Sequence, residues 1–99
     1  MIDGLIAGQV FGDPERRMGK ANTNFVVAKV KAQAGDGDTC LINVIAFDAS
    51  TCEQLLNLRD GDAVSLAGSL TPKVWTDKQG ITRAAIDMIA NKILSLHTH

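Results

Sequence analysis

The sequence predicts an all-β domain in which five strands and one short helix form a barrel. Three observations lead to this fold class. Apolar and polar side chains alternate in short runs, glycines fall inside and between these runs, and only one segment has the pattern of a helix. The chain has 99 residues, of which 45% are hydrophobic and 21% are charged, a balance typical of one folded domain.

The first strand is predicted over residues 2–11. Gly4 and Gly8 lie inside it, and glycine within a strand often indicates a bulge or a sharp bend. The string Gly12-Asp13-Pro14 ends the strand. The polar residues 15–23 that follow are predicted to form a loop.

The second and third strands are predicted over residues 24–33 and 39–47. The second alternates clearly, whereas the third is apolar on both faces, so neither of its faces is expected to be simply solvated. The string Gly-Asp-Gly-Asp at residues 35–38 predicts the turn between them. Its two aspartates, Asp36 and Asp38, lack the remaining ligands of a calcium-binding loop.

One helix is predicted over residues 50–58. Ser50 and Glu53 have the spacing of a capping box, in which each side chain accepts a hydrogen bond from the backbone of the other residue. Gly61 stands where a glycine often ends a helix. The leucines of this segment supply its buried side.

Two final strands are predicted over residues 62–70 and 81–96, joined by residues 72–80. Three strands, a helix and a two-stranded hairpin suit a five-stranded Greek-key barrel, the OB-fold. An open sandwich would not explain the helix. We expect residues 1–96 to form this domain and 97–99 to be a short polar end.

The sequence does not predict an enzyme, a cofactor or a metal site. No serine, cysteine or carboxylate stands in a recognisable nucleophile motif, and there is no glycine-rich phosphate loop. The cysteines are expected to be two buried thiols and the histidines a frayed end, because neither pair has the further ligands of a zinc site. These residues are Cys40, Cys52, His97 and His99.

The sequence also predicts a cytoplasmic protein that does not enter a membrane. No apolar run reaches the roughly 18 residues that would indicate a membrane span. The first ten residues lack the basic region of a secretory signal.

Charge is distributed unevenly along the chain, although the net charge is only −1. Residues 1–31 and 71–99 are basic, and residues 32–70 are acidic, so a basic surface would form if the two ends meet in the fold. Trp75, the one tryptophan, lies between Lys73 and Lys78. It could pack against a strand or a neighbouring subunit, or it could stack on a base while the lysines attract phosphates.

Other aromatic and basic residues have two interpretations each. A buried position is the commoner case for a strand phenylalanine such as Phe47 or Phe25, and packing against the core or a loop is expected for Phe11. Lys29 and Lys31 share one face of the second strand. They would either line a groove or keep an edge strand soluble.

Six sequence strings, in order, resemble the bacterial and phage single-stranded DNA-binding protein family over nearly the whole chain. They are Gly8; Gly12-Asp13-Pro14-Glu15 with Arg17; residues 21–28 (ANTNFVVA); residues 43–47 (NVIAF); the run from Gly61 to Leu70; and Trp75-Thr76-Asp77-Lys78 with Gly80. This resemblance implies an OB-fold, binding of single-stranded DNA, and a homo-oligomer, usually a tetramer or dimer.

The resemblance also implies roles for individual residues. Trp75 and Phe47 match positions that stack on bases, and Lys73 and Arg83, on the same hairpin as Trp75, would be basic neighbours of the bound strand. We therefore expect single-stranded DNA to contact these four residues and four further basic or polar ones. The full set is Trp75, Phe47, Lys73, Lys78, Arg83, Lys29, Lys31 and Asn43.

The chain departs from the family pattern at three positions. Gln33 and Leu41 stand where bacterial members often have tryptophan, and Asn43 stands where a basic residue is common. Because each stacked base contributes about 1–3 kcal/mol, we expect weaker binding or a shorter site per subunit.

The sequence ends soon after the predicted barrel, so the acidic tail that recruits replication and repair enzymes is expected to be absent. This favours a phage, plasmid or accessory member over the main protein of a bacterial nucleoid, although replication proteins stay possible partners. A second hypothesis is an OB-fold protein like primosomal replication protein N, which assembles a replication-restart complex. A third is a scaffold without a nucleic-acid role. Because the first and third strands are unusually apolar, we expect at least a dimer.

Overall fold

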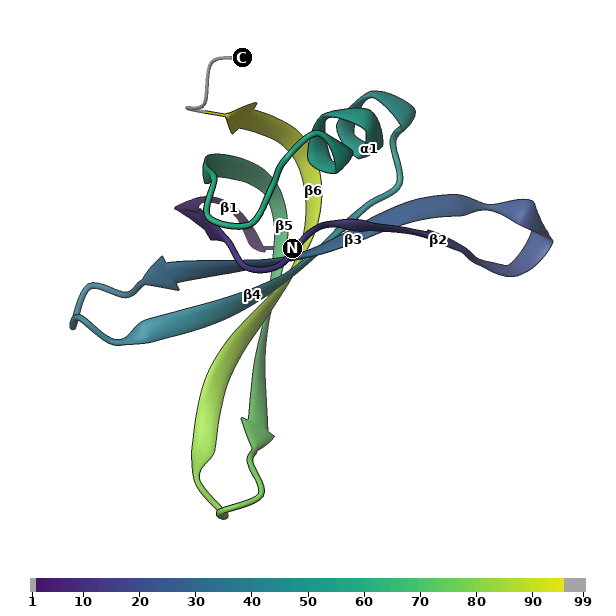
Figure 1. Ribbon diagram of the computed structural model, residues 1–99. Coiled ribbons are helices and arrows are strands. Elements are labelled where there is room, and N and C mark those ends of the chain that lie inside the picture. The colour runs from purple at the N-terminus through teal and green to yellow at the C-terminus, as the bar shows by residue number, and fades with distance from the viewer. Residues whose placement is uncertain (1, 96–99) are drawn as a thin grey trace.

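Five strands of the protein close into a ring, and a sixth lies outside it (Figure 1). The computed structural model describes residues 2–95, apart from the side chains of Asn22, Trp75 and Ser95. In chain order the elements are β1 (Ile2–Val10), β2 (Glu15–Met18), the 3-10 turn η1 (Lys20–Asn22), β3 (Asn24–Gln33), β4 (Thr39–Ala46), α1 (Ala49–Leu56), β5 (Ala63–Thr76) and β6 (Thr82–Ser95).

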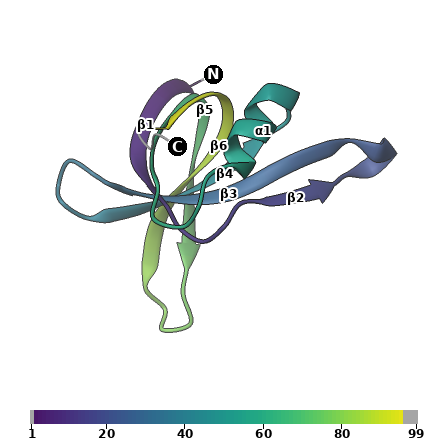
Figure 2. The ribbon, with the colours of Figure 1, turned by 45° about the horizontal axis from the view of Figure 1, so that its top comes forward.

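The ring has the order β1-β5-β6-β4-β3, and the end of β1 returns to pair with β3. Only β4 and β6 are parallel neighbours; the other pairs are antiparallel. In the chain, the helix α1 follows β4 and precedes β5. In space it lies at the end of the ring away from the β5–β6 hairpin (Figures 1 and 2). The predicted five-stranded barrel with one short helix is therefore confirmed.

The core fills the inside of this ring. Alternate residues of β3 and β4 point inward and are buried, and α1 adds Cys52 and Leu55 to the same cluster. The other residues of β3 and β4 face outward, so period-two alternation separates core from surface. The inward residues of the two strands are Val26, Ala28, Val30, Ile42, Val44 and Ala46.

Two glycines allow the strands to approach closely. A Cβ atom on Gly8 would collide with the carbonyl oxygen of Lys31, where β1 reaches β3. A Cβ on Gly68 would collide with the carbonyl oxygen of Ile89, at a register shift between β5 and β6. Glycine at these positions lets the sheet bend and close.

The helix cap differs from the prediction. Asp48, not Ser50, precedes the first turn, and its carboxylate accepts a hydrogen bond from the Thr51 amide at 3.0 Å. The helix begins one residue earlier than expected and ends at Leu56 with Asn57 as its cap, so Gly61 does not end it. An aspartate directly after a strand is an equally good cap, and the nearby Ser-x-x-Glu spacing obscured it.

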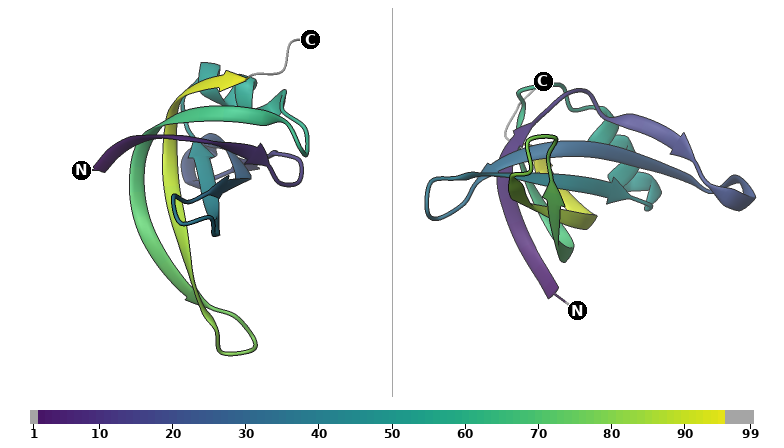
Figure 3. Two further views of the ribbon diagram at one scale, coloured as in Figure 1. Left: turned by 90° about the vertical axis from the view of Figure 1, so that its left-hand side faces the viewer. Right: turned by 90° about the horizontal axis from the view of Figure 1, so that it is seen from below.

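Two segments expected to be loops are strands. Residues 15–18 form β2, which pairs with β3, and the polar composition reflects exposure of all four residues. The fourth ring strand does not end at residue 70 but continues as β5 to Thr76, so Lys73 and Trp75 are strand residues. The β5–β6 hairpin consequently extends well beyond the barrel (Figures 1 and 3).

Candidate nucleic-acid interface

The outer face of β3 and β4 brings several predicted site residues together. Lys29 is directly opposite Asn43, and Lys31 is directly opposite Leu41. The side chains of Lys29, Lys31 and Asn43 are exposed, whereas Leu41 is half-buried. Because the inward positions of both strands are apolar, the outward positions are the ones available to a ligand.

Two grooves lie on this face, one on each side of Phe11. The β2-side groove has a volume of about 710 Å³ and is lined by Phe11, Gly12, Asp13, Glu15, Arg17, Val27, Ala28, Lys29, Asn43, Val44, Ile45 and Asp87. The hairpin-side groove has a volume of about 540 Å³ and is lined by Phe11, Lys31, Asp38, Thr39, Leu41, Ile81, Thr82, Arg83 and Ala84. Phe11 is the residue that the two linings share.

The two grooves differ in charge. Two cations and one carboxylate, Lys31, Arg83 and Asp38, line the hairpin-side groove. Two cations, Lys29 and Arg17, line the β2-side groove together with three carboxylates. Each groove has a cation in an ion pair, Arg17 with Glu15 at 3.2 Å and Arg83 with Asp77 at 3.1 Å. An anionic backbone would therefore be attracted more strongly to the hairpin-side groove.

Asn43 already has a partner in the β2-side groove. Its side-chain nitrogen donates to the carboxylate of Asp87 at 3.2 Å, across the parallel β4–β6 pair. The Asp87 side chain and Lys29 both line this groove, with Asn43 between them in the sheet. A phosphate there would meet a negative charge, which reduces what Lys29 and Asn43 offer to it.

Phe47 lies just beyond β4 and is not part of either groove lining. Its side chain is 51% exposed, so the buried position weighed for it from the sequence is wrong. The ring of Phe25 is 6.0 Å away between centroids, tilted by 49°. Such a pair is mutually stabilising and leaves part of the Phe47 ring accessible.

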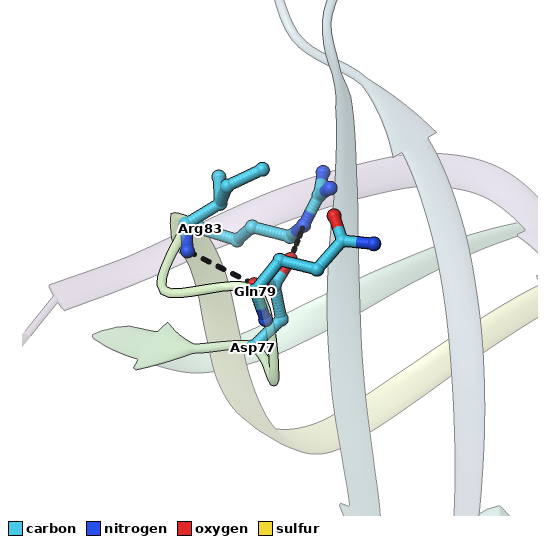
Figure 4. Close-up of polar contacts among 4 residues, drawn as sticks. Asp77, Gln79 and Arg83 are labelled. Atoms are coloured by element: carbon cyan, nitrogen blue, oxygen red, sulfur yellow. Dashed lines mark hydrogen bonds and ion pairs between the residues drawn. The ribbon is translucent and has the colours of Figure 1, made fainter.

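The tip of the β5–β6 hairpin is organised by one carboxylate (Figure 4). Oδ1 of Asp77 accepts hydrogen bonds from the backbone of Gln79 and Ile81, each at 2.9 Å, and Oδ2 accepts from Arg83 Nε at 3.1 Å. The Ile81 hydrogen bond is the main cause that lowers the pKa of Asp77, and Arg83 lowers it further. The ionised carboxylate fixes the turn and orients the Arg83 guanidinium.

The remaining predicted site residues lie along the same hairpin. Lys73 is exposed on β5 opposite Ala85, and Lys78 is exposed in the turn; neither lines a groove. The backbone of Trp75 pairs with that of Arg83. The side chain of Trp75 lies outside the described part of the structure.

Phe11 is a surface residue that the sequence did not single out. Its side chain is 44% exposed, and the ammonium of Lys31 lies 3.9 Å from the ring centroid. The expected packing against core or loop is not what the structure has. An aromatic residue directly before a Gly-Asp-Pro turn, where a strand leaves the barrel, was the available signal.

Residues 2–95 hold no group of three or more His, Cys, Asp or Glu side chains that could bind a metal. Both cysteines are free; Cys52 is buried as expected, whereas Cys40 is only half-buried. Among the same residues, no helix is long and apolar enough to cross a membrane.

Comparison with protein families matches residues 1–96 to the model described as "Single-strand binding protein family". This match favours the DNA-binding family over the group of primosomal replication protein N, so the second hypothesis from the sequence is not supported. Comparison with curated protein sequences found no match.

Solved structures share the fold over nearly the whole chain. The small single-stranded DNA-binding protein from Streptomyces coelicolor has a TM-score of 0.74 at 22% identity, covering 95% of this chain and 93% of that one. The mitochondrial single-stranded DNA binding protein from S. cerevisiae has a TM-score of 0.72 at 15% identity, covering 99% and 97%. A Plasmodium falciparum single-stranded DNA-binding protein in complex with single-stranded DNA has a TM-score of 0.71 at 14% identity, covering 98% of this chain and 96% of that one.

Proposed function

The chain belongs to the single-strand binding protein family, and we propose on this premise that it binds and protects single-stranded DNA without sequence preference. Residues 1–96 form the binding domain in this proposal, and the setting is replication, recombination or repair in a bacterial nucleoid, a phage or a plasmid. The observation that carries the proposal is the family match over these residues. The exposed cations and aromatic rings around the two grooves support it.

Binding combines phosphate attraction with base stacking. Phosphates follow the cations of the hairpin and of β3, and bases stack on Trp75 and Phe47, because every base has a π-face and stacking needs no sequence. The strand passes through the hairpin-side groove, where cations outnumber carboxylates. The cations are Lys31, Lys73, Lys78 and Arg83. Lys29 and Asn43 contribute less, because Asp87 lines the same groove and accepts a hydrogen bond from Asn43.

The mechanism is sequestration, in which no covalent bond is made or broken. A bound strand is held away from nucleases and from its complement for as long as the phosphates and bases stay engaged. Binding therefore weakens steeply as the salt concentration rises, because salt competes for the phosphates.

We also propose that the protein acts as a homo-oligomer, a tetramer or a dimer. Leu5 is 72% exposed on β1, and Leu94 is exposed on β6 two strands away. Along most of its length β1 pairs only with β5, so its second edge is open between Ile2 and Gly8. A second subunit would cover both the edge and the apolar side chains.

Fluorescence titration with an oligo-dT strand tests the DNA-binding proposal. At low salt and micromolar protein, we expect Trp75 emission to change on addition of oligo-dT and much less on addition of a duplex of equal length. Unchanged emission together with unchanged electrophoretic mobility of the oligonucleotide would contradict the proposal.

Light scattering tests the assembly. We expect a mass of at least two subunits for the wild type and a smaller mass for Leu5→Glu, which places a charge on the exposed apolar strand. A wild-type protein that stays monomeric at all concentrations used for DNA binding would contradict the homo-oligomer.

A further inference from the structure

Phe11 lies where the two grooves meet, and core packing does not explain its position. Its neighbour Val10 is 2% exposed and belongs to the core, whereas Phe11 is 44% exposed and does not. A large apolar side chain that remains exposed beside a polar groove is a candidate contact for a ligand.

The backbone around Phe11 is held firmly. Its own N–H donates to the carbonyl oxygen of Lys29 at 2.8 Å, which ties it to β3. The next N–H, that of Gly12, donates to the carboxylate of Asp60 at 2.7 Å. Gly12 has a φ of 77°, a left-handed conformation that favours glycine. The ring is thus presented from a fixed backbone, which lowers the ordering cost of binding.

Phe11 also lies beside a position that lacks an aromatic side chain. Leu41 lines the hairpin-side groove with Phe11, and the described lining of that groove holds no aromatic residue besides Phe11. Lys31 contacts both of them, because its ammonium lies 3.9 Å from the Phe11 ring centroid and its backbone is paired with that of Leu41. A ring from the end of β1 therefore reaches the groove that β4 leaves without one.

We propose that Phe11 is a base-stacking residue of this chain and supplies the platform missing at Leu41; this inference rests on the DNA-binding function proposed above. In the free protein the Lys31 ammonium covers the ring at 3.9 Å. When DNA binds, a base takes the ring face and the ammonium moves to an adjacent phosphate. The exchange is favourable because a cation–π contact at an exposed site is weak, whereas a phosphate offers a full negative charge.

Equilibrium binding of Phe11→Leu tests the inference, because leucine keeps an apolar side chain and removes the ring. We expect about 5- to 150-fold weaker binding to oligo-dT, the value of one stacked base. The slope of log affinity against log salt should stay unchanged, because no charge is lost. An oligonucleotide with abasic sites throughout should bind the variant and the wild type equally.

Two variants serve as controls. Met18→Leu changes another exposed apolar residue, one that lines neither groove, and should bind like the wild type. A protein with Phe11→Trp and Trp75→Phe has its one tryptophan at the proposed platform, and its emission should change when oligo-dT binds.

The outcomes separate this inference from the function on which it rests. If wild-type protein fails to bind oligo-dT, the proposed function fails and this inference fails with it. If wild type binds while Phe11→Leu binds equally well, or loses the same factor on the abasic strand, only the stacking role of Phe11 is overturned. Unchanged emission from the tryptophan at position 11 at saturating DNA would overturn it as well.

Discussion

Two lysines on one strand should contribute unequally to DNA binding. Lys29 and Lys31 are both exposed on the outer face of β3, two residues apart. Lys31 lies in the hairpin-side groove with a second cation and one carboxylate, whereas three carboxylates line the groove around Lys29. For single strands, each phosphate neutralised by a cation adds about 0.7 to the slope of log affinity against log salt. We expect Lys31→Met to lower the slope by about this amount and Lys29→Met to change it much less.

The assay is oligo-dT binding by fluorescence or mobility shift, from about 20 to 300 mM salt, a range over which counterion release dominates affinity. Each variant is a control for the other, because strand, face and substitution are the same. Equal slope changes for the two variants, or a larger change for Lys29→Met, would refute the reasoning from groove charge.

Three further predictions concern single residues. Asp87→Asn should tighten oligo-dT binding by about two- to fivefold at low salt, because it removes a carboxylate from the β2-side groove; weaker binding would contradict this. Asp77→Asn should lower the melting temperature at neutral pH, because the ionised carboxylate that fixes the turn is lost. Folding lowers the pKa of Asp77 from its usual 3.8, so the carboxylate stabilises the folded protein fully above pH 3.8 and loses this effect as the pH falls through the folded-state pKa. The difference in melting temperature between wild type and Asp77→Asn should therefore shrink on acidification, and a difference that grows would contradict this. Gly8→Ala should lower the free energy of unfolding by about 1–3 kcal/mol in denaturant titrations, because its Cβ meets the Lys31 carbonyl; unchanged stability would show that the strands can shift apart.

The barrel was predictable because its core follows a simple period. The alternation in residues 24–33 separated the two faces of β3, and Val26, Ala28 and Val30 of its apolar face are buried. The same alternation placed Lys29 and Lys31 on the opposite face of β3. The local pattern is enough here because burying an unpaired polar side chain in the barrel would cost more free energy than the strand propensity of any residue could offset. In residues 39–47 both faces are largely apolar, so the sequence did not identify which face of β4 points inward.

The features that local pattern missed depend on distant contacts. The strand β2 is polar because both of its faces are exposed, so only its pairing with β3 reveals it. The capping aspartate was hidden by a second plausible cap two residues later. Phe11 and Asp87 enter the grooves through the closure of β1 onto β3 and the parallel β4–β6 pair. The Gly-Asp-Pro string after Phe11 indicates where β1 ends, but the adjacent sequence does not indicate which strands β1 and β6 meet.

Salt-dependent binding of oligo-dT by the wild type beside Trp75→Ala tests the central claim most directly. The claim is that Trp75 and other aromatic residues of the barrel and the β5–β6 hairpin hold the bases while the neighbouring cations hold the phosphates. We predict that the wild type binds with a clear salt dependence, and that Trp75→Ala binds about 5- to 150-fold more weakly at every salt concentration with the same slope. Equal affinity of the two proteins, or wild-type binding that does not respond to salt, would contradict the account.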